Sequence, residues 1–188
     1  MSPSGLHADA RHLLSTWAAP DESQDVLRAQ YIAHLDGYPD AVLRECRAGH
    51  ITASTLIIDT SRESVLLTLH PIVGRWLQTG GHCEPGDTDL VAAAAREAAE
   101  ESGIDNLSID AMPLRLDRHA VRCRADDGEA TTLDHLDVQF LAVAPAYARE
   151  VRTHESLDLR WWPWTTLPED TDASVRALVA AALERTGR

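Results

Sequence analysis

The chain contains no lysine, so all 17 of its basic residues are arginine. This absence excludes covalent chemistry that begins with a lysine amine, such as Schiff-base formation. The 30 acidic residues outnumber the basic ones and give a formal net charge of -13 at pH 7. Such a charge repels the phosphates of nucleic acids and of anionic membranes. We therefore expect a small-molecule partner and neither nucleic acid nor membrane.

Cysteine is scarce, and long apolar runs are missing. Cys46, Cys83 and Cys123 are scattered without CxxC spacing, so the cysteines indicate neither a disulfide framework nor a zinc site. No run approaches the roughly eighteen apolar residues of a membrane span. No charged segment followed by an apolar stretch opens the chain, as it would in a secretory signal. These absences predict a cytoplasmic protein.

Length and hydrophobic periodicity predict one compact domain with a helical extension. The chain has 188 residues, of which 44% are apolar, an ordinary content for a globular core. Residues 1–45 have helical periodicity and form the predicted extension, while residues 46–188 form the main domain. Strands are expected at 51–59, 64–70, 76–79, 114–124, 133–144 and 157–162, a hairpin turn at 126–129, and a closing helix at 172–185. Propensity alone predicts only an α+β fold.

The most informative segment follows the third expected strand. It reads Gly80-Gly81-His82-Cys83-Glu84-Pro85-Gly86-Asp87, and after an alanine run the chain continues with Arg96-Glu97-Ala98-Ala99-Glu100-Glu101-Ser102-Gly103. On a helix ended by Gly103, the three glutamates stand at i, i+3 and i+4 and share one face. Like charges at that spacing cost a few tenths of a kcal/mol per pair. A hard cation such as Mg2+ or Mn2+ would turn that repulsion into coordination.

At these residues the chain resembles the Nudix hydrolases. The family signature is Gly, five residues, Glu, seven residues, then Arg-Glu-U-x-Glu-Glu-x-Gly-U, where U is aliphatic. The matching residues are Gly81, Arg96, Glu97, Glu100, Glu101, Gly103 and Ile104. Asp87 stands in place of the first glutamate, and eight residues rather than seven separate it from Arg96. We expect the additional residue in the turn before the helix, because an insertion inside the helix would rotate the carboxylates by about 100°.

The resemblance implies a fold, a metal site and an activity. The implied fold is the α/β/α sandwich with a mixed sheet and a catalytic loop-helix-loop. The implied ligands of Mg2+ or Mn2+ are Glu97, Glu100, Glu101 and the main-chain carbonyl of Gly80. Arg96 would orient these ligands, and Asp87 would fix the loop or the metal-bound waters.

The implied reaction is hydrolysis of a phosphoric anhydride. Water attacks phosphorus in a nucleoside diphosphate linked to another moiety, or in a nucleoside triphosphate, and a carboxylate takes the water's proton. Glu101 or Glu100 could be that base. Glu155, on a loop outside the motif, is a third candidate. Which diphosphate is hydrolysed stays open.

Further candidates surround the motif. Gly81, His82, Trp76 and His135 are expected at the substrate, although anchoring of the glycine loop is the favoured role of Trp76. His82, His119, His135 and Asp137 could hold a second metal or a phosphate, since alternation places His135 and Asp137 on one side of their strand. Alternation also puts Trp161 and Trp162 on opposite faces. His50 and His70 are interpreted as local hydrogen-bonding residues.

Two alternative functions stay open. The same fold supports an isomerase acting on isopentenyl diphosphate, for which Cys83 would supply the required cysteine. A catalytically silent ligand-binding or regulatory module is the other alternative, although such relatives usually lose motif glutamates. The N-terminal helices could also mediate a homodimer.

Overall fold

A single mixed β-sheet organises the chain. The computed structural model describes residues 5–124, 130–154 and 156–187. The strands are β1 (His50–Ile58), β2 (Ser64–Leu69), β3 (Trp76–Leu77), β4 (Thr79–His82), β5 (Ser108–Ile109), β6 (Arg115–Arg124), β7 (Ala130–Val143) and β8 (Asp158–Pro163). They follow the order β3-β2-β1-β7-β5, with β4 paired to β1, β6 to β7 and β8 to β2. β1 and β7 run parallel along their shared register, whereas the other pairs are antiparallel.

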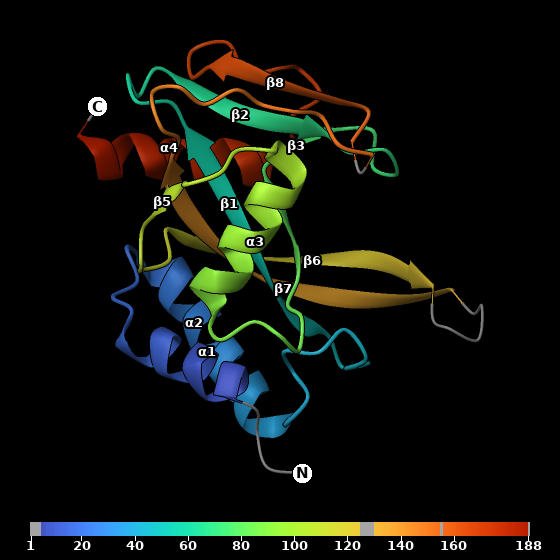
Figure 1. Cartoon of the computed structure of the whole chain (residues 1–188). Coiled ribbons are helices and arrows are strands. Elements are labelled where there is room, and N and C mark those ends of the chain that lie inside the picture. Colours follow the sequence, from blue (N-terminus) through green and yellow to red (C-terminus); the bar gives the residue numbers. More distant parts are fainter. Residues whose placement is uncertain (1–4, 125–129, 155, 188) are drawn as a thin grey trace.

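Helices cover both faces of this sheet (Figure 1). They are α1 (Gly5–Thr16), α2 (Glu22–Gly37), α3 (Leu90–Ser102) and α4 (Ala173–Thr186). Alternation along β1 explains the layers, because successive side chains point to opposite faces. Ile51 and Ala53 pack in one apolar cluster with Ala93 of α3. Leu56 and Ile58 pack in another cluster, which contains the buried residues of α4.

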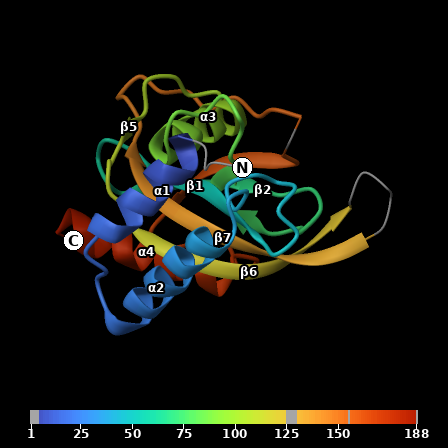
Figure 2. The ribbon, with the colours of Figure 1, turned by 90° about the horizontal axis from the view of Figure 1, so that it is seen from below.

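The N-terminal helices belong to the apolar core. Leu14 of α1 and Tyr31 of α2 are fully buried in the same cluster as Ile51 of β1. The side chain of Gln24 accepts a hydrogen bond from the backbone N–H of Leu116 at 2.7 Å and donates one to its carbonyl at 3.1 Å. α2 thus lies along the outer edge of β6, as the view from below shows (Figure 2). The expected homodimer through these helices stays a prediction.

The motif helix α3 has a defined beginning and end. Asp89 accepts a hydrogen bond from the backbone N–H of Ala92 and so caps the N-terminus. Gly103 ends the helix with φ 66°, as predicted, and a Cβ at this position would lie 2.6 Å from the Cβ of Val151. Two residues, Thr88 and the cap Asp89, therefore separate Asp87 from Leu90, the first residue of the helix.

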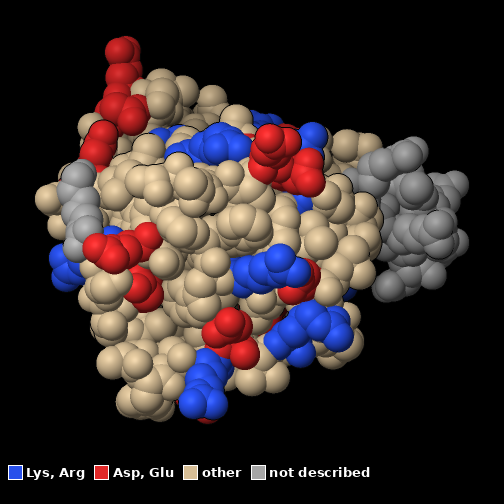
Figure 3. Space-filling model, turned by 90° about the horizontal axis from the view of Figure 1, so that it is seen from above, with Lys and Arg blue, Asp and Glu red and all other residues tan. Residues whose placement is uncertain are grey.

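All predicted strands and helices within the described residues are present. The segment expected at 76–79 is divided into β3 and β4, which continue into the glycine pair. The two-residue strand β5 was not predicted, and the hairpin turn expected at 126–129 lies outside the described residues. Among the described helices, none is both long and apolar enough to cross a membrane. Acidic and arginine side chains are interspersed on the face seen from above, so the negative charge is not gathered there (Figure 3).

Candidate active site around the motif helix

The two motif glycines allow a close approach between β4 and its neighbours. Gly80 has φ 148°, and a Cβ there would lie 2.3 Å from the Cβ of Ser54 on β1. A Cβ on Gly81 would lie 2.7 Å from Oε2 of Glu97 on α3. The absence of a side chain at Gly81 therefore leaves room for the Glu97 carboxylate against the strand.

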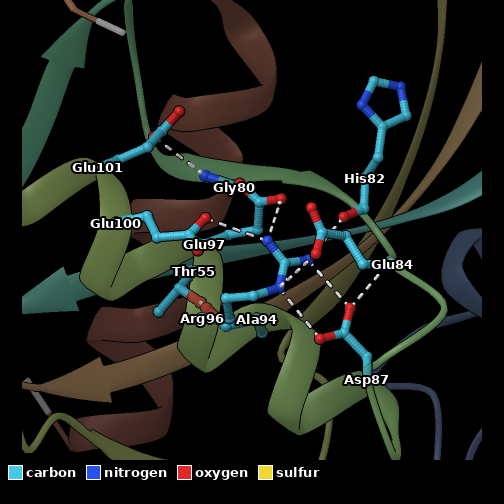
Figure 4. A network of polar contacts seen from close by, with 10 residues as sticks. All are labelled: Thr55, Gly80, His82, Glu84, Asp87, Ala94, Arg96, Glu97, Glu100 and Glu101. Atoms are coloured by element: carbon cyan, nitrogen blue, oxygen red, sulfur yellow. Dashed lines mark hydrogen bonds and ion pairs between the residues drawn. The ribbon is translucent and has the colours of Figure 1, made fainter. Parts of the chain in front are cut away.

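Arg96 connects the loop, the helix and the strand (Figure 4). Its Nε and Nη2 each donate to one carboxylate oxygen of Asp87 at 3.0 Å. Nη2 also donates to the main-chain carbonyl of His82 at 2.9 Å. Nη1 donates to Glu97 at 2.9 Å and to Glu100 at 3.1 Å. The hydrogen bonds to Asp87, followed by those to Glu97, raise the pKa of Arg96 above its usual value, so the guanidinium stays charged.

Asp87 holds the loop that precedes the helix. Its Oδ2 accepts the backbone N–H of Glu84 at 2.7 Å, in addition to the contacts with Arg96. Burial opposes ionisation of Asp87, but these hydrogen bonds prevail and lower its pKa. The geometry shows Asp87 fixing the loop, which is one of the two roles expected for it.

Two of the three glutamates of α3, Glu97 and Glu101, reach β4. The side chain of Glu97 is 13% exposed and that of Glu100 is 55% exposed. Glu101 accepts a hydrogen bond from the backbone N–H of Gly80 at 3.2 Å. The structure therefore brings together Gly80, Gly81, Arg96 and the three glutamates, as the sequence predicted. Their carboxylate and carbonyl oxygens are the hard ligands that Mg2+ and Mn2+ prefer, and the space opposite Gly81 keeps a carboxylate beside the strand.

His82 and His135 lie together on the sheet face opposite α3. Register pairs His135 with His50, and His82 with Thr52, so these side chains share one face. The rings of His82 and His135 are 5.0 Å apart, and each lies within 5.0 Å of the ring of His50. His82 is joined to the motif by its carbonyl, which Arg96 binds.

His70 and His50, both predicted to form local hydrogen bonds, differ in their contacts. Nδ1 of His70 accepts the backbone N–H groups of Ile72 and Val73 at 3.2 Å, so its predicted hydrogen-bonding role is confirmed. The same prediction for His50 is wrong within the described part of the chain, where neither of its ring nitrogens has a hydrogen-bond partner. Burial lowers the pKa of His50.

Sequence reasoning missed most of a polar network beside the histidines. Asp137 is buried and accepts hydrogen bonds from Thr52 at 2.9 Å, Ser54 at 2.6 Å and Gln139 at 3.2 Å. Burial raises its pKa, and the hydrogen bonds oppose that effect. The available signal was the alternation of His50, Thr52 and Ser54 with apolar residues in β1. His135 and Asp137 do lie on one side of β7, as expected.

Trp76, Trp161 and Trp162 pack in or against apolar clusters of the fold. Trp76 is 8% exposed, and its ring meets that of Trp162 at 5.2 Å within the apolar cluster against α4. This packing supports anchoring, and substrate contact by Trp76 stays a prediction. Trp161 packs against a different cluster from Trp162, in agreement with alternation. Glu155 lies outside the described residues.

Cys83 has the environment of an inert thiol. It is 5% exposed and belongs to the apolar cluster that contains Ala93 and Ala94. Burial raises its pKa to about 12. Because the thiolate is the reactive form, this cysteine is a poor nucleophile or proton donor–acceptor near neutral pH.

Comparisons with known proteins agree with this geometry. The family model described as the NUDIX domain matches residues 49–183. No curated protein matches the sequence. Among solved structures, a NUDIX-family hydrolase from Clostridium perfringens is 22% identical with a TM-score of 0.53, and the match covers 73% of this chain and 97% of that one. The dihydroneopterin triphosphate pyrophosphohydrolase of E. coli is 22% identical with a TM-score of 0.54, over 71% of this chain and 92% of that one.

A third structure covers more of the chain. The NUDIX domain of Shewanella oneidensis NrtR, crystallised with ADP ribose, is 22% identical with a TM-score of 0.55, over 84% of this chain and 97% of that one. Likenesses at this identity establish the fold. The predicted α/β/α sandwich and the resemblance drawn from the motif are both confirmed.

Proposed function

The chain belongs to the family of the NUDIX domain, whose solved members include hydrolases, and from this premise we propose that it is a divalent-metal-dependent pyrophosphohydrolase. The substrate is a nucleoside diphosphate linked to another moiety, or a nucleoside triphosphate. The observation that carries the proposal is the arrangement of Glu97, Glu100 and Glu101 around Arg96 and the glycine pair.

The residues fit a hard cation. Glu97, Glu100, Glu101 and the carbonyl of Gly80 would hold Mg2+ or Mn2+. When bound, the metal offsets the negative charge of the diphosphate oxygens and favours ionisation of water. A net charge of -13 therefore does not exclude an anionic substrate, because the sign of the charge at the site is local.

The chain's own residues supply orientation and a proton acceptor. Arg96 holds Glu97 and Glu100 through one guanidinium nitrogen, while its other two nitrogens grip Asp87. In the proposed reaction the water oxygen forms a bond to phosphorus, the bridging P–O bond breaks, and Glu101 or Glu100 accepts the water's proton. The leaving group departs as a phosphate.

The isomerase alternative is weakened by the state of Cys83. A catalytic cysteine must reach the substrate and exchange a proton, whereas this thiol is buried with a pKa of about 12. The silent binding module is opposed by the retention of all three motif glutamates. Turnover distinguishes it from the hydrolase directly.

The test is product release across a panel of nucleotide sugars, ADP-ribose, dinucleotides and nucleoside triphosphates, each with Mg2+ and with Mn2+. Glu101→Gln keeps the shape of the side chain and removes its charge, so we expect turnover to fall by about two orders of magnitude or more. Glu184→Gln, on an exposed position of α4, is the matched control and should behave as the unaltered chain. Full activity of Glu101→Gln would refute the assigned site. Metal-independent binding of a nucleotide without turnover would instead favour the binding module.

A further inference from the structure

Three histidines from three different strands meet on the sheet face opposite α3. His50 comes from β1, His82 from β4 and His135 from β7. Their ring centroids form a nearly equilateral triangle with sides of 4.8, 5.0 and 5.0 Å. One ring nitrogen from each histidine can be chosen so that all three lie within 4.8 Å of one another. The strands are adjacent in the sheet, so the triangle is fixed by hydrogen-bonded backbone.

Four ring nitrogens of this cluster are buried and have no hydrogen-bond partner among the described residues. His50 is 1% exposed, yet both of its ring nitrogens are buried without a hydrogen bond. Nε2 of His82 and Nε2 of His135 are also buried and unpaired. A buried polar atom without a partner costs about 1–3 kcal/mol. Four such atoms in one cluster indicate that a ligand completes the site.

The rings are in the form that binds metals. Burial lowers the pKa of His50, and it lowers that of His135 to about 3. These two imidazoles are therefore neutral near pH 7 and offer lone pairs rather than positive charge. An anion such as phosphate gains little from neutral rings.

We propose that His50, His82 and His135 form a zinc-binding site, separate from the carboxylate site of the motif helix. Imidazole nitrogen suits Zn2+, whereas the oxygens of the glutamate site suit Mg2+ or Mn2+. Three histidines satisfy three positions of a tetrahedral ion and leave the fourth open. Zn–N bonds of about 2.0–2.1 Å require the three rings to turn inward, and His82 and His135 are only half-buried and can do so.

Two neighbouring features set the properties of this zinc site. Arg44 acts electrostatically on all three rings, and its positive charge opposes a cation. The main-chain carbonyl of His82 accepts a hydrogen bond from Arg96. Zinc bound to the His82 side chain would therefore fix the end of β4 that Arg96 also contacts. The site does not depend on the proposed hydrolase function, because none of its three side chains is a motif carboxylate.

The experiment is a zinc titration of the full, untagged chain after removal of metals with a chelator. We expect one Zn2+ per chain by calorimetry, with a dissociation constant of about a micromolar or tighter, and a rise in Tm. Co2+ in place of Zn2+ should give the intense visible absorption of a four-coordinate ion. An absence of zinc binding, or a weak six-coordinate cobalt spectrum, would overturn the proposal.

Variants locate the ion. His82→Asn and His135→Asn should each weaken zinc binding by at least about tenfold, while His12→Asn, on an exposed position of α1, should leave it unchanged. The double variant Glu97→Gln/Glu101→Gln should keep the cobalt spectrum although it disables the carboxylate site. Loss of zinc in that double variant, with retention in His135→Asn, would place the ion at the glutamates and refute the histidine site. His50→Asn is informative only if it folds, since His50 is buried, and the two half-buried histidines decide the question without it.

Discussion

Asp87 and Arg96 form a bidentate ion pair in which Nε and Nη2 each lie 3.0 Å from one carboxylate oxygen. Asp87 belongs to the loop after β4, and Arg96 lies near the middle of α3. The pair therefore fixes the loop to the helix, while the remaining guanidinium nitrogen contacts Glu97 and Glu100. A shorter acidic side chain than the family's glutamate still reaches the arginine.

Replacement of Arg96 by lysine tests this geometry. A lysine ammonium keeps the charge but cannot form the planar fork that binds Asp87 and both glutamates. We expect kcat/KM of Arg96→Lys to fall by about 10- to 100-fold, with a change in the apparent affinity for Mg2+. Steady-state kinetics against a metal titration measure both. Kinetics equal to those of the unaltered chain would show that charge alone is needed.

The two glycines should respond differently to alanine. In Gly81→Ala the new Cβ meets only the end of the flexible Glu97 side chain, which can move away. We expect a large loss of turnover and a small loss of stability. In Gly80→Ala the Cβ meets the backbone and Cβ of Ser54, and φ is unfavourable for alanine, so a destabilisation of about 2–4 kcal/mol is expected. Chemical denaturation and activity assays of both variants distinguish loss of stability from loss of turnover. Equal destabilisation of the two variants would contradict the inference that Gly81 makes room only for the Glu97 side chain.

The histidine cluster should make the metal-free chain sensitive to mild acid. The pKa values of His82 and His135 lie near 4 and 3 in the folded chain, against about 6.5 when unfolded. Between these values the unfolded chain binds more protons, so stability falls as the pH drops below about 6.5. His119, whose pKa is raised by its hydrogen bond to Asp117, and Asp137, whose pKa is raised by burial, act in the opposite direction.

A double variant isolates this effect. His82→Asn/His135→Asn, compared with the unaltered chain in chelator, should lose less stability between pH 6.5 and pH 5. Urea denaturation at each pH measures this loss. His119 and Asp137 are present in both chains, so their contributions cancel in the comparison. Parallel stability curves would show that these rings titrate normally.

Removal of the Arg44 charge should change the zinc affinity in the opposite direction to removal of a ligand histidine. Its charge acts on all three rings, so Arg44→Gln should tighten zinc binding. A gain of about 1 kcal/mol, or roughly fivefold in affinity, is reasonable for an exposed charge. Calorimetry in low and moderate salt measures it, and the gain should shrink as salt rises. Weaker binding in Arg44→Gln would contradict a cation at the cluster.

Local pattern predicted where the motif residues lie relative to one another, because they are close in sequence. The i, i+3 and i+4 spacing of Glu97, Glu100 and Glu101 places them on one helix face whatever the rest of the chain does. The hydrophobic alternation of β1 and β7 similarly marked strands. Neither pattern contains the strand order or the register.

The histidine triangle could not be predicted for this reason. It exists because β7 pairs with β1 in parallel, so that His135 lies opposite His50, while β4 pairs with β1 on the other side. Those pairings join residues far apart in the chain, and a shift of one residue in either register would turn a ring to the opposite face. The two-residue strand β5 was too short to show any periodicity.

Gln24 has a consequence for handling this protein. Its amide satisfies both backbone groups of Leu116 on the outer edge of β6, a place where another strand could otherwise add. A fragment trimmed to residues 46–188 would lose that protection, and it would also lose the side chains of Leu14 and Tyr31 that pack in the core. Such an exposed strand edge is a template for self-association. We therefore expect the N-terminal helices to limit self-association, and a working fragment to need them in addition to residues 46–188.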